Sequence, residues 1–323
     1  MTKTIFVTRQ IPETGIKMLR DKGYVVDIRE KDSMPTQKEL IKALKKKPYD
    51  AVVSSWPEPI DAKIFERFPS VKIFANFTIG FDNIDIESAK TSGVTITNAP
   101  AITATEAVAE HTFALAMALA ARVVEADEFI RRGKYKGWSA VNFIGTDLVG
   151  KTWGLIGAGR IGENVTKYAS AFGLKVIYTD LTRHENIENK YGATFFSTPE
   201  EILKQADIIS LHVPLMDSTK HLINAERLNM MKKTAFLINT ARGPIVDEAA
   251  LVSALQNKTV AGAGLDVFEF EPKLAKGLVK LDNVILTPHI GSASDTARNE
   301  MSRLVADNII AFFEGKVPPN KVN

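Results

Sequence analysis

Short apolar runs of strand length alternate with amphipathic segments of helix length along almost all of the 323 residues. This alternation is typical of parallel sheets covered by helices, because two parallel strands need a long crossover connection between them. The runs form two series, separated by a long helical stretch. They predict strands at 4–9, 24–29, 49–55 and 71–77 in the first series, and at 152–157, 174–180, 193–197, 207–213, 234–240, 260–266 and 283–287 in the second. We therefore predict an α/β protein with two doubly wound parallel sheets.

Composition limits the class of protein further. With 45% hydrophobic and 24% charged residues the sequence resembles soluble globular proteins, and its length suits two domains. The net charge is +3, and the dense basic run at 42–48 closes a predicted amphipathic helix, so we expect no nucleic-acid partner. No apolar stretch reaches the roughly 18 to 20 residues that a membrane-spanning helix needs, so we expect no membrane partner. The absence of cysteine excludes disulfides and thiolate metal sites and fits a reducing, cytoplasmic location; no metal is expected.

The longest helical pattern runs from about Thr103 to Arg132. Its apolar content exceeds what one face of a domain needs, and we therefore expect a homodimer. An irregular stretch follows at 133–150. The last helical pattern, at 294–316, has too little sheet beside it to form a domain of its own and could return to either unit.

A glycine-rich turn opens the second series. The strand at 152–157 runs into Gly157, Gly159 and Gly162, which form the pattern G-x-G-x-x-G at the start of a helix. The first glycine permits the tight turn, the second lets backbone amides reach a pyrophosphate, and the third lets helix and strand pack closely. Asp180 ends the next predicted strand, 18 residues after Gly162, close to the roughly 20 expected for an acid that binds the adenosine ribose. The pattern predicts a dinucleotide site.

Asp180 bears on the choice of cofactor. A carboxylate at this position accepts hydrogen bonds from the ribose hydroxyls and repels a 2′-phosphate, which favours NAD over NADP. Arg183 and His184 follow closely and could accommodate a phosphate, so NADP stays possible. The alternative interpretation is a strand-end aspartate that caps the next helix.

Polar groups follow three strands of the second series. Arg242 comes just after one strand, Glu269 and Glu271 lie on the loop after the next, and His289 follows the last. Ligands of doubly wound sheets bind outside the carboxyl ends of strands, where these residues lie. Reduction of a 2-keto acid needs a cation that holds the carboxylate and polarises the ketone, and an acid that protonates the new alkoxide. A histidine beside a carboxylate suits the second task, since the negative partner favours the imidazolium. The alternative is an ordinary salt bridge between Arg242 and a glutamate.

The segments GLIGAGRIG, NTARGPIVDE, AGLDVFEFEP and TPHIGSA, in this order, resemble the D-2-hydroxyacid dehydrogenase family, and the likeness extends over nearly the whole sequence. The resemblance implies a Rossmann-type NAD-binding domain at 99–288, inserted in a flavodoxin-like substrate domain at 1–98 and 289–323. It also implies that Arg242 binds the substrate and that His289 is the acid/base. Glu271 is then the partner of His289, and Glu269 is a bystander.

The same resemblance extends the site to further residues. It implies that the backbone amides of Ile79 and Gly80 hold the substrate carboxylate, and that Thr240 and Asp266 contact the nicotinamide ring and its carboxamide. His111 is interpreted as a packing residue. The other positions implied to contact the cofactor are Gly157, Gly159, Arg160, Ile161, Gly162, Asp180, Val213, Pro214, Ala241, His289 and Gly291, and Ser292 is a further substrate position.

Within the family, the C-terminal segment from His289 and the pair Gly137 and Trp138 are similar to glyoxylate/hydroxypyruvate reductases. In those dimers the tryptophan reaches into the neighbour's substrate pocket. The two residues after it here depart from the basic residue and proline that often follow. Trp56 stands where relatives tend to carry a leucine near the pocket wall, which implies an effect on substrate size.

We therefore expect this protein to reduce glyoxylate or hydroxypyruvate to the D-2-hydroxy acid by hydride transfer from NADH, with NADP possible. The runner-up is a D-lactate dehydrogenase, or a D-2-hydroxyacid dehydrogenase for longer substrates. A different class also stays open, because NADH-sensing transcriptional co-repressors resemble these dehydrogenases and use the cofactor to drive assembly.

Overall fold

Both predicted sheets are present, and all neighbouring strands in them run parallel. The computed structural model describes residues 2–323, which divide into two units. Unit 1 runs to Ala104 and resumes at Ser292, and unit 2 spans Thr105–Gly291. The predicted α/β class is confirmed.

In unit 1 five strands pair in the order β2-β1-β3-β4-β5, which is the 2-1-3-4-5 order of flavodoxin-like folds. The strands are β1 (Thr4–Val7), β2 (Val25–Ile28), β3 (Ala51–Ser54), β4 (Ile73–Asn76) and β5 (Thr95–Thr97). The helices are α1 (Glu13–Asp21), α2 (Gln37–Leu44), α3 (Ala62–Arg67), α4 (Ile86–Thr91) and α12 (Asp295–Phe313). The strand β5 was not among those predicted, because three residues are too few to show an alternating pattern, and it forms by pairing with β4.

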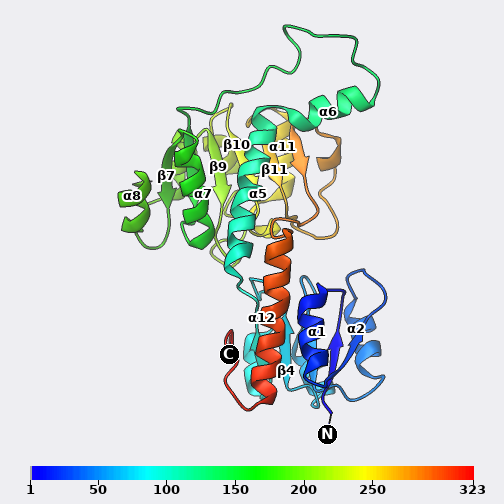
Figure 1. Ribbon diagram of the computed structural model, residues 1–323. Helices are drawn as coiled ribbons and strands as arrows, with labels where there is room; N and C mark the ends of the chain where they lie inside the picture. The colour runs from blue at the N-terminus through cyan, green and yellow to red at the C-terminus, as the bar shows by residue number, and fades with distance from the viewer. Residues whose placement is uncertain (1) are drawn as a thin grey trace. The chain divides into compact units, whose positions relative to one another are not determined.

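The helix α12 brings the end of the polypeptide back to unit 1, where it lies beside α1 (Figure 1). The two helices approach closely at Gly15. A Cβ atom there would lie 2.0 Å from the carbonyl oxygen of Ser302. The Gly15 N–H donates to the Ser302 hydroxyl at 3.0 Å, and that hydroxyl donates to the carbonyl of Pro12 at 2.7 Å. The contact therefore joins residues almost 300 positions apart by hydrogen bonds as well as by packing.

In unit 2 seven strands pair in the order β12-β11-β10-β9-β6-β7-β8. Counted from β6, this is the Rossmann order 3-2-1-4-5-6 with one further strand at the edge. The strands are β6 (Thr152–Ile156), β7 (Lys175–Thr179), β8 (Thr194–Phe195), β9 (Ile208–Leu211), β10 (Phe236–Asn239), β11 (Gly262–Leu265) and β12 (Val284–Leu286). The helices after β6 are α7 (Arg160–Ala171), α8 (Glu185–Tyr191), α9 (Pro199–Gln205), α10 (Ala225–Met230) and α11 (Glu248–Gln256), with single turns η1 (Gly243–Ile245) and η2 (Leu278–Lys280). The strands β9, β10 and β11 are buried throughout, which explains their nearly continuous apolar sequences.

The predicted long helix is divided in two. It forms α5 (Ile102–Ala120) and α6 (Val123–Arg131), whose axes bend by 63° at the break. The prediction of one continuous helix is therefore wrong. Arg122 at the break has φ 54°, and its guanidinium binds Glu125 and lies over the ring of Phe143. Thr146 N–H donates to the carbonyl of Ala120 at 2.8 Å. The later segment thus caps α5, a tertiary effect that helical periodicity does not contain.

Across residues 2–323 no single helix combines the length and hydropathy of a membrane span; α5 and α6 meet that criterion only as a bent pair.

Candidate active site

The carboxyl ends of the strands of unit 2 bring most of the predicted site to one edge of its sheet. Because all these strands are parallel, the turns that follow them lie at the same edge. The residues in these turns are Gly157 after β6, Asp180 after β7, Val213 and Pro214 after β9, Thr240, Ala241 and Arg242 after β10, Asp266 after β11, and His289 after β12.

The three glycines of the first turn have different surroundings. A Cβ atom on Gly157, whose φ is 96°, would lie 2.7 Å from the backbone of His212, and one on Gly162 would lie 2.5 Å from the carbonyl of Gly157. A Cβ atom on Gly159 would meet nothing within 4 Å. The first and third glycines therefore serve packing, whereas the second leaves open space before α7.

The start of α7 suits an anion. Gly159 is its N-cap and supplies no side-chain acceptor, and Arg160 and Ile161 form the first helical residues. The first N–H groups of a helix lack intrahelical partners and attract negative charge. The open space at Gly159 and the uncapped helix start therefore fit the pyrophosphate of a dinucleotide.

Asp180 is partly exposed, with 22% of its side chain accessible. One carboxylate oxygen accepts from Ala158 N–H at 2.7 Å, and the other accepts from Leu181 N–H at 2.6 Å. The Nε2 atom of His184 lies 3.3 Å from Oδ2 of Asp180. The backbone bonds tie the carboxylate to the glycine-rich turn.

Arg183, considered as a phosphate ligand, forms a bidentate pair with Glu188 at 2.8 and 2.6 Å. Hydrogen bonds from Arg183 and then from Tyr178 lower the pKa of Glu188 to about 2. The guanidinium is thus already engaged by a carboxylate that stays ionised at ordinary pH.

His289 and Glu271 are in direct contact. The Nδ1 atom of His289 lies 3.0 Å from Oε2 of Glu271, while Oε1 of Glu271 accepts from Phe268 N–H at 3.0 Å. The side chains are 34% and 16% exposed, respectively. With Nδ1 facing the carboxylate, Nε2 is the ring nitrogen on the other side, and His289 holds a left-handed backbone with φ 55°. Such strained positions persist where the surroundings impose them, often at functional sites.

Asp266 lies beneath the turn that carries His289 and is 1% exposed. Its oxygens accept from Thr287 Oγ1, Ile290 N–H and Gly291 N–H at 2.7 to 2.8 Å. His111 also lies close, at 3.3 Å. Burial alone would raise the pKa of Asp266, but the hydrogen bonds from His111, Thr287 and Ile290 outweigh it and leave the pKa below its usual value. An ionised Asp266 thus fixes the turn that carries His289.

The turn after β10 is held mainly by the side chain of Asn239, which binds the backbone of the turn. The Asn239 amide donates to the carbonyl of Arg242 at 2.9 Å, and its oxygen accepts from Ala241 N–H at 3.1 Å. Arg242 Nη1 donates to the carbonyl of Ala241 at 2.8 Å. The hydroxyl of Thr240 lies 2.7 Å from that of Thr112. These contacts give the base of the Arg242 side chain a defined position.

Glu269, interpreted from the sequence as a bystander, belongs to a second carboxylate network. Its N–H donates to Glu248 Oε1 at 2.6 Å, and Glu248 N–H donates back to Glu269 Oε2 at 3.2 Å. Glu248 also accepts from Ala275 N–H at 3.1 Å, and His221 lies 2.7 Å from Glu269 Oε1. Burial raises the pKa of Glu248. The network holds both ends of the loop that carries Glu271. No sequence pattern around His221 predicted this network.

The remaining predicted residues lie elsewhere. Trp56 precedes a cis proline in the turn after β3, and Ile79 and Gly80 follow β4, all in unit 1. Ser292 is the first residue of the returning part of unit 1. Trp138 lies on the coil after α6 and is 87% exposed.

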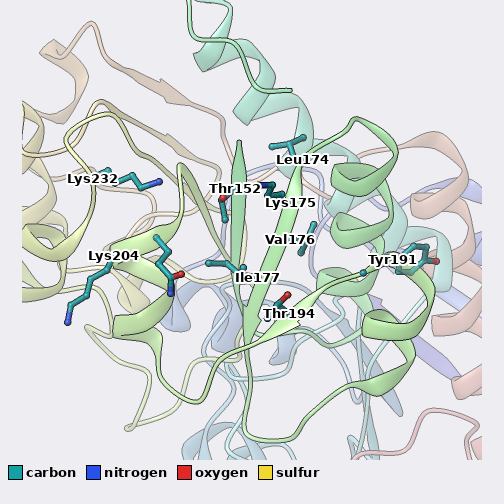
Figure 2. Close-up of a pocket in the computed structure, with 11 residues that line it drawn as sticks. Thr152, Leu174, Lys175, Val176, Ile177, Tyr191, Thr194, Lys204 and Lys232 are labelled. Carbon is teal, nitrogen blue, oxygen red and sulfur yellow. The ribbon is translucent and has the colours of Figure 1, made fainter. Parts of the chain in front are cut away.

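A cavity of about 810 Å³ lies at the opposite edge of the unit 2 sheet (Figure 2). Its lining includes Thr152 and Lys175, the first residues of β6 and β7, and none of the predicted site residues. Across residues 2–323 no group of three or more histidines and carboxylates is arranged to hold a metal ion.

Comparison with known proteins finds relatives over the whole length of the chain. Residues 113–291 match the family model described as D-isomer specific 2-hydroxyacid dehydrogenase, NAD binding domain. A glyoxylate reductase of Pyrococcus horikoshii is 47% identical over 100% of this chain and 96% of its own length. A crystal structure of a Thermus thermophilus protein is 40% identical, with a TM-score of 0.92 over 99% of this chain and 100% of that one.

A second similar structure was solved with a cofactor bound. An NADPH-dependent glyoxylate/hydroxypyruvate reductase of Sinorhizobium meliloti, in complex with NADP and malonate, is 33% identical, with a TM-score of 0.85 over 100% of this chain and 97% of that one.

Proposed function

The chain belongs to the D-isomer specific 2-hydroxyacid dehydrogenase family, and from this membership we propose that glyoxylate and hydroxypyruvate are its substrates and NADH its preferred reductant. It is an NAD(P)-dependent dehydrogenase that reduces a keto acid to a hydroxy acid. The observation that carries the proposal is the contact of His289 with Glu271 at the sheet edge that also bears Arg242 and the glycine-rich turn.

Three residues of unit 2, Arg242, His289 and Glu271, each have one role in the proposed reaction. Arg242 holds the keto acid and polarises its ketone by hydrogen bonds that strengthen as negative charge develops on the oxygen. The nicotinamide, when bound, supplies the hydride to C2. His289 gives a proton from Nε2 to the alkoxide, and Glu271 keeps the ring oriented and stabilises its protonated form. The product is the D-2-hydroxy acid.

Further substrate contacts in this proposal come from unit 1, and the cofactor contacts come from unit 2. In unit 1 the N–H groups of Ile79 and Gly80 take the carboxylate, with Trp56 and Ser292 as further substrate residues. In unit 2 the open turn at Gly159 takes the pyrophosphate.

NADH preference rests on Asp180 and Arg183. Ala158 N–H holds the Asp180 carboxylate beside the glycine-rich turn. At this position the carboxylate accepts hydrogen bonds from the ribose hydroxyls and repels a 2′-phosphate. Arg183, the closest guanidinium in sequence, is paired with Glu188. The Sinorhizobium meliloti relative is described as NADPH-dependent, so the ratio of kcat/KM values for NADH and NADPH is the measurement that tests the preference.

A homodimer is proposed from the surface after α5. The helix α6 and the coil that follows project away from the sheet of unit 2 (Figure 1). Six large apolar side chains on this segment are between 59% and 87% exposed: Ile130, Tyr135, Trp138, Val141, Ile144 and Val149. Apolar surface of this extent is typical of a protein contact, and we propose a second copy as the occupant, with Trp138 at the partner's substrate site. Sedimentation of the wild type as a 35.5 kDa particle at micromolar concentration would rule this out.

The activity test is NADH oxidation at 340 nm with glyoxylate, hydroxypyruvate, pyruvate and 2-ketoisocaproate, in wild type and two histidine variants. His289→Gln should lose about 10²- to 10⁴-fold in kcat, as expected for a lost general acid. His221→Gln is the matched control, because it also removes a histidine that pairs with a glutamate on the same loop, and it should keep most activity. Equal activity of His289→Gln and wild type would contradict the assignment.

The pH profile and the substrate panel separate the alternatives. The rate of glyoxylate reduction should fall as the pH rises, because protonation of the alkoxide needs an acid; a rate that is flat between about pH 6 and pH 10 excludes a general-acid step. Faster turnover of pyruvate would indicate a D-lactate dehydrogenase, and faster turnover of 2-ketoisocaproate would indicate an enzyme for longer D-2-hydroxy acids. NADH binding without turnover of any keto acid would indicate a cofactor-sensing protein. The cytoplasmic location stays a prediction, to be tested by cell fractionation.

A further inference from the structure

Three successive carbonyl groups in the turn after β4 accept hydrogen bonds from within unit 1. The Thr78 carbonyl accepts from Ala99 N–H at 2.8 Å, and the Ile79 carbonyl accepts from the Asn98 side-chain amide at 2.6 Å. The Gly80 carbonyl accepts from the hydroxyl of Thr78 and, at 3.4 Å, from the side-chain amide of Asn76. Each carbonyl of the turn is thus bound to the body of the unit.

The directions of these carbonyl groups determine the directions of the N–H groups that follow them. In a trans peptide the carbonyl and the following N–H point in opposite directions, and the cis peptides of the structure lie elsewhere. The N–H groups of Ile79, Gly80 and Phe81 therefore point away from the groups that hold the carbonyls. No acceptor for these three N–H groups is present among residues 2–323.

The side chains that hold the carbonyls are themselves fixed. Asn76 is fully buried; its oxygen accepts from the Ser54 hydroxyl at 3.0 Å, and its amide donates to Thr78 Oγ1 at 2.7 Å and to Asn83 Oδ1 at 2.9 Å. The Asn83 amide in turn donates to the carbonyl of Glu58 at 2.9 Å. The buried network therefore joins the turn at Gly80 to the turn that carries Trp56.

Asn98 is anchored at its backbone by the C-terminal part of the sequence. Its N–H donates to the carbonyl of Asn320 at 3.3 Å, and its own carbonyl accepts from the Asn308 amide at 3.1 Å. The Asn98 side chain is left to bind the Ile79 carbonyl.

We propose that Asn98, Thr78 and Asn76 are positioning residues that aim the N–H groups of Gly80 and Phe81 at the carboxylate of the keto acid, beside the Ile79 N–H, whose peptide is held by the backbone of Ala99. The proposal rests on the proposed function, which places the substrate carboxylate at this turn. Hydrogen bonds to a charged acceptor are stronger than neutral ones, and N–H groups fixed before binding need no reorganisation when the ligand arrives. Without the hydrogen bonds from these three side chains the peptides that carry the Gly80 and Phe81 N–H groups can rotate, and the two N–H groups then lose their fixed directions.

The test compares Thr78→Val, Thr78→Ser and Asn98→Ala with wild type. Thr78→Val and Asn98→Ala should raise the KM for glyoxylate and the Kd for oxalate about tenfold, the effect of one lost hydrogen bond to a charged group. Thr78→Ser keeps the hydroxyl and should keep wild-type values. The kcat at saturating glyoxylate and the Kd for NADH should stay within about twofold, because the carboxylate is bound more weakly to the same extent in the ground state and in the transition state.

Ser302→Ala is the matched control for stability. It removes the hydroxyl that binds Gly15 N–H and the carbonyl of Pro12 within unit 1, and it leaves Asn98 and the hydrogen bonds to the turn in place, so it should lower the melting temperature without raising the KM. An unchanged KM and oxalate Kd in both Thr78→Val and Asn98→Ala would overturn the proposal. If Asn98→Ala does not fold, the pair Thr78→Val and Thr78→Ser decides.

Oxalate binding separates this proposal from the proposed function. If wild type binds oxalate but turns over no keto acid, weaker oxalate binding by Thr78→Val still supports the positioning role while the reductase assignment fails. If wild type binds no oxalate up to millimolar concentration, the turn holds no carboxylate and the positioning proposal is overturned as well.

Discussion

Gly243→Ala tests whether the turn after β10 sets the position of the loop that carries Glu271. In the structure a Cβ atom on Gly243 would lie 1.9 Å from the carbonyl carbon of Phe268, 2.0 Å from its oxygen and 2.4 Å from the nitrogen of Glu269. All three atoms belong to the backbone, so no side chain can rotate to relieve the overlap. The loop or the turn must move.

The size of the movement follows from these distances. An ordinary contact of a Cβ atom begins at 3.4 Å, so the two backbones must separate by about 1.5 Å. Overpacking typically costs about 1–3 kcal/mol, and a cost of about 2 kcal/mol would lower the melting temperature of a unit of this size by about 4–8 °C. A shift of about 1 Å at a catalytic group can lower the rate about 100-fold. We therefore expect both effects, the second through the contact of Glu271 with His289.

The assay is calorimetry together with kcat for glyoxylate, measured well below the melting temperature. Gly154→Ala is the control, since a Cβ atom there would overlap the side chains of Ile202 and Ala206 in the core, away from the loop. It should lose stability and keep kcat. A Gly243→Ala enzyme that melts earlier but turns over like Gly154→Ala would refute the reasoning, because the turn would then support the fold without setting the site.

Two further predictions concern other turns at the same sheet edge. Gly159→Ala should raise the KM for NADH at least about tenfold, because its Cβ atom occupies the space proposed for the pyrophosphate. The melting temperature should stay unchanged, because that atom meets no protein atom within 4 Å. Equal KM values in the variant and the wild type would show that the cofactor does not bind at this turn. Burial of His212 lowers its pKa to about 3 from an unfolded value of 6.5. The hydroxyl of Ser210 accepts from Trp153 Nε1 at 2.8 Å and lies 2.9 Å from Nε2 of His212. The free energy of unfolding should therefore fall as the pH drops from 6.5 towards 3, by at most about 1.4 kcal/mol per pH unit. In His212→Asn, urea titrations should show this slope reduced, and an unchanged slope would assign it to other groups.

The fold was predictable where a signal is local. Buried parallel strands need continuous apolar runs, and all eleven predicted runs contain a strand. The signal failed where structure depends on distant contacts. β5 forms by pairing with β4, and the break at Arg122 is held by Glu125 and by the segment that returns to Ala120.

The candidate site divides in the same way. The glycine pattern and the positions of Arg242 and His289 after strands are local properties, and the sequence contains them. The supporting residues are not of this kind. Asn98 reaches Ile79 from 19 residues away, and Glu248 reaches Glu269 from 21 residues away. An asparagine after a strand and a glutamate in the first turn of a helix are ordinary features, so only tertiary contact gives them a function.

Glu269 and Glu271 show why residue type and position alone leave the site incomplete. The two glutamates lie two residues apart on one loop, and either could pair with a histidine on the evidence of the sequence. In the structure both do so, Glu269 with His221 and Glu271 with His289. Glu269 and Glu248 also each donate a backbone N–H to the carboxylate of the other, which ties this end of the loop to α11. The carboxylate of Glu271 instead accepts from Phe268 N–H and closes the loop on itself. The hydrogen bonds between Glu269 and Glu248 therefore anchor this end of the loop, and this anchoring leaves Glu271 at a defined position beside His289, as the proposed proton transfer requires.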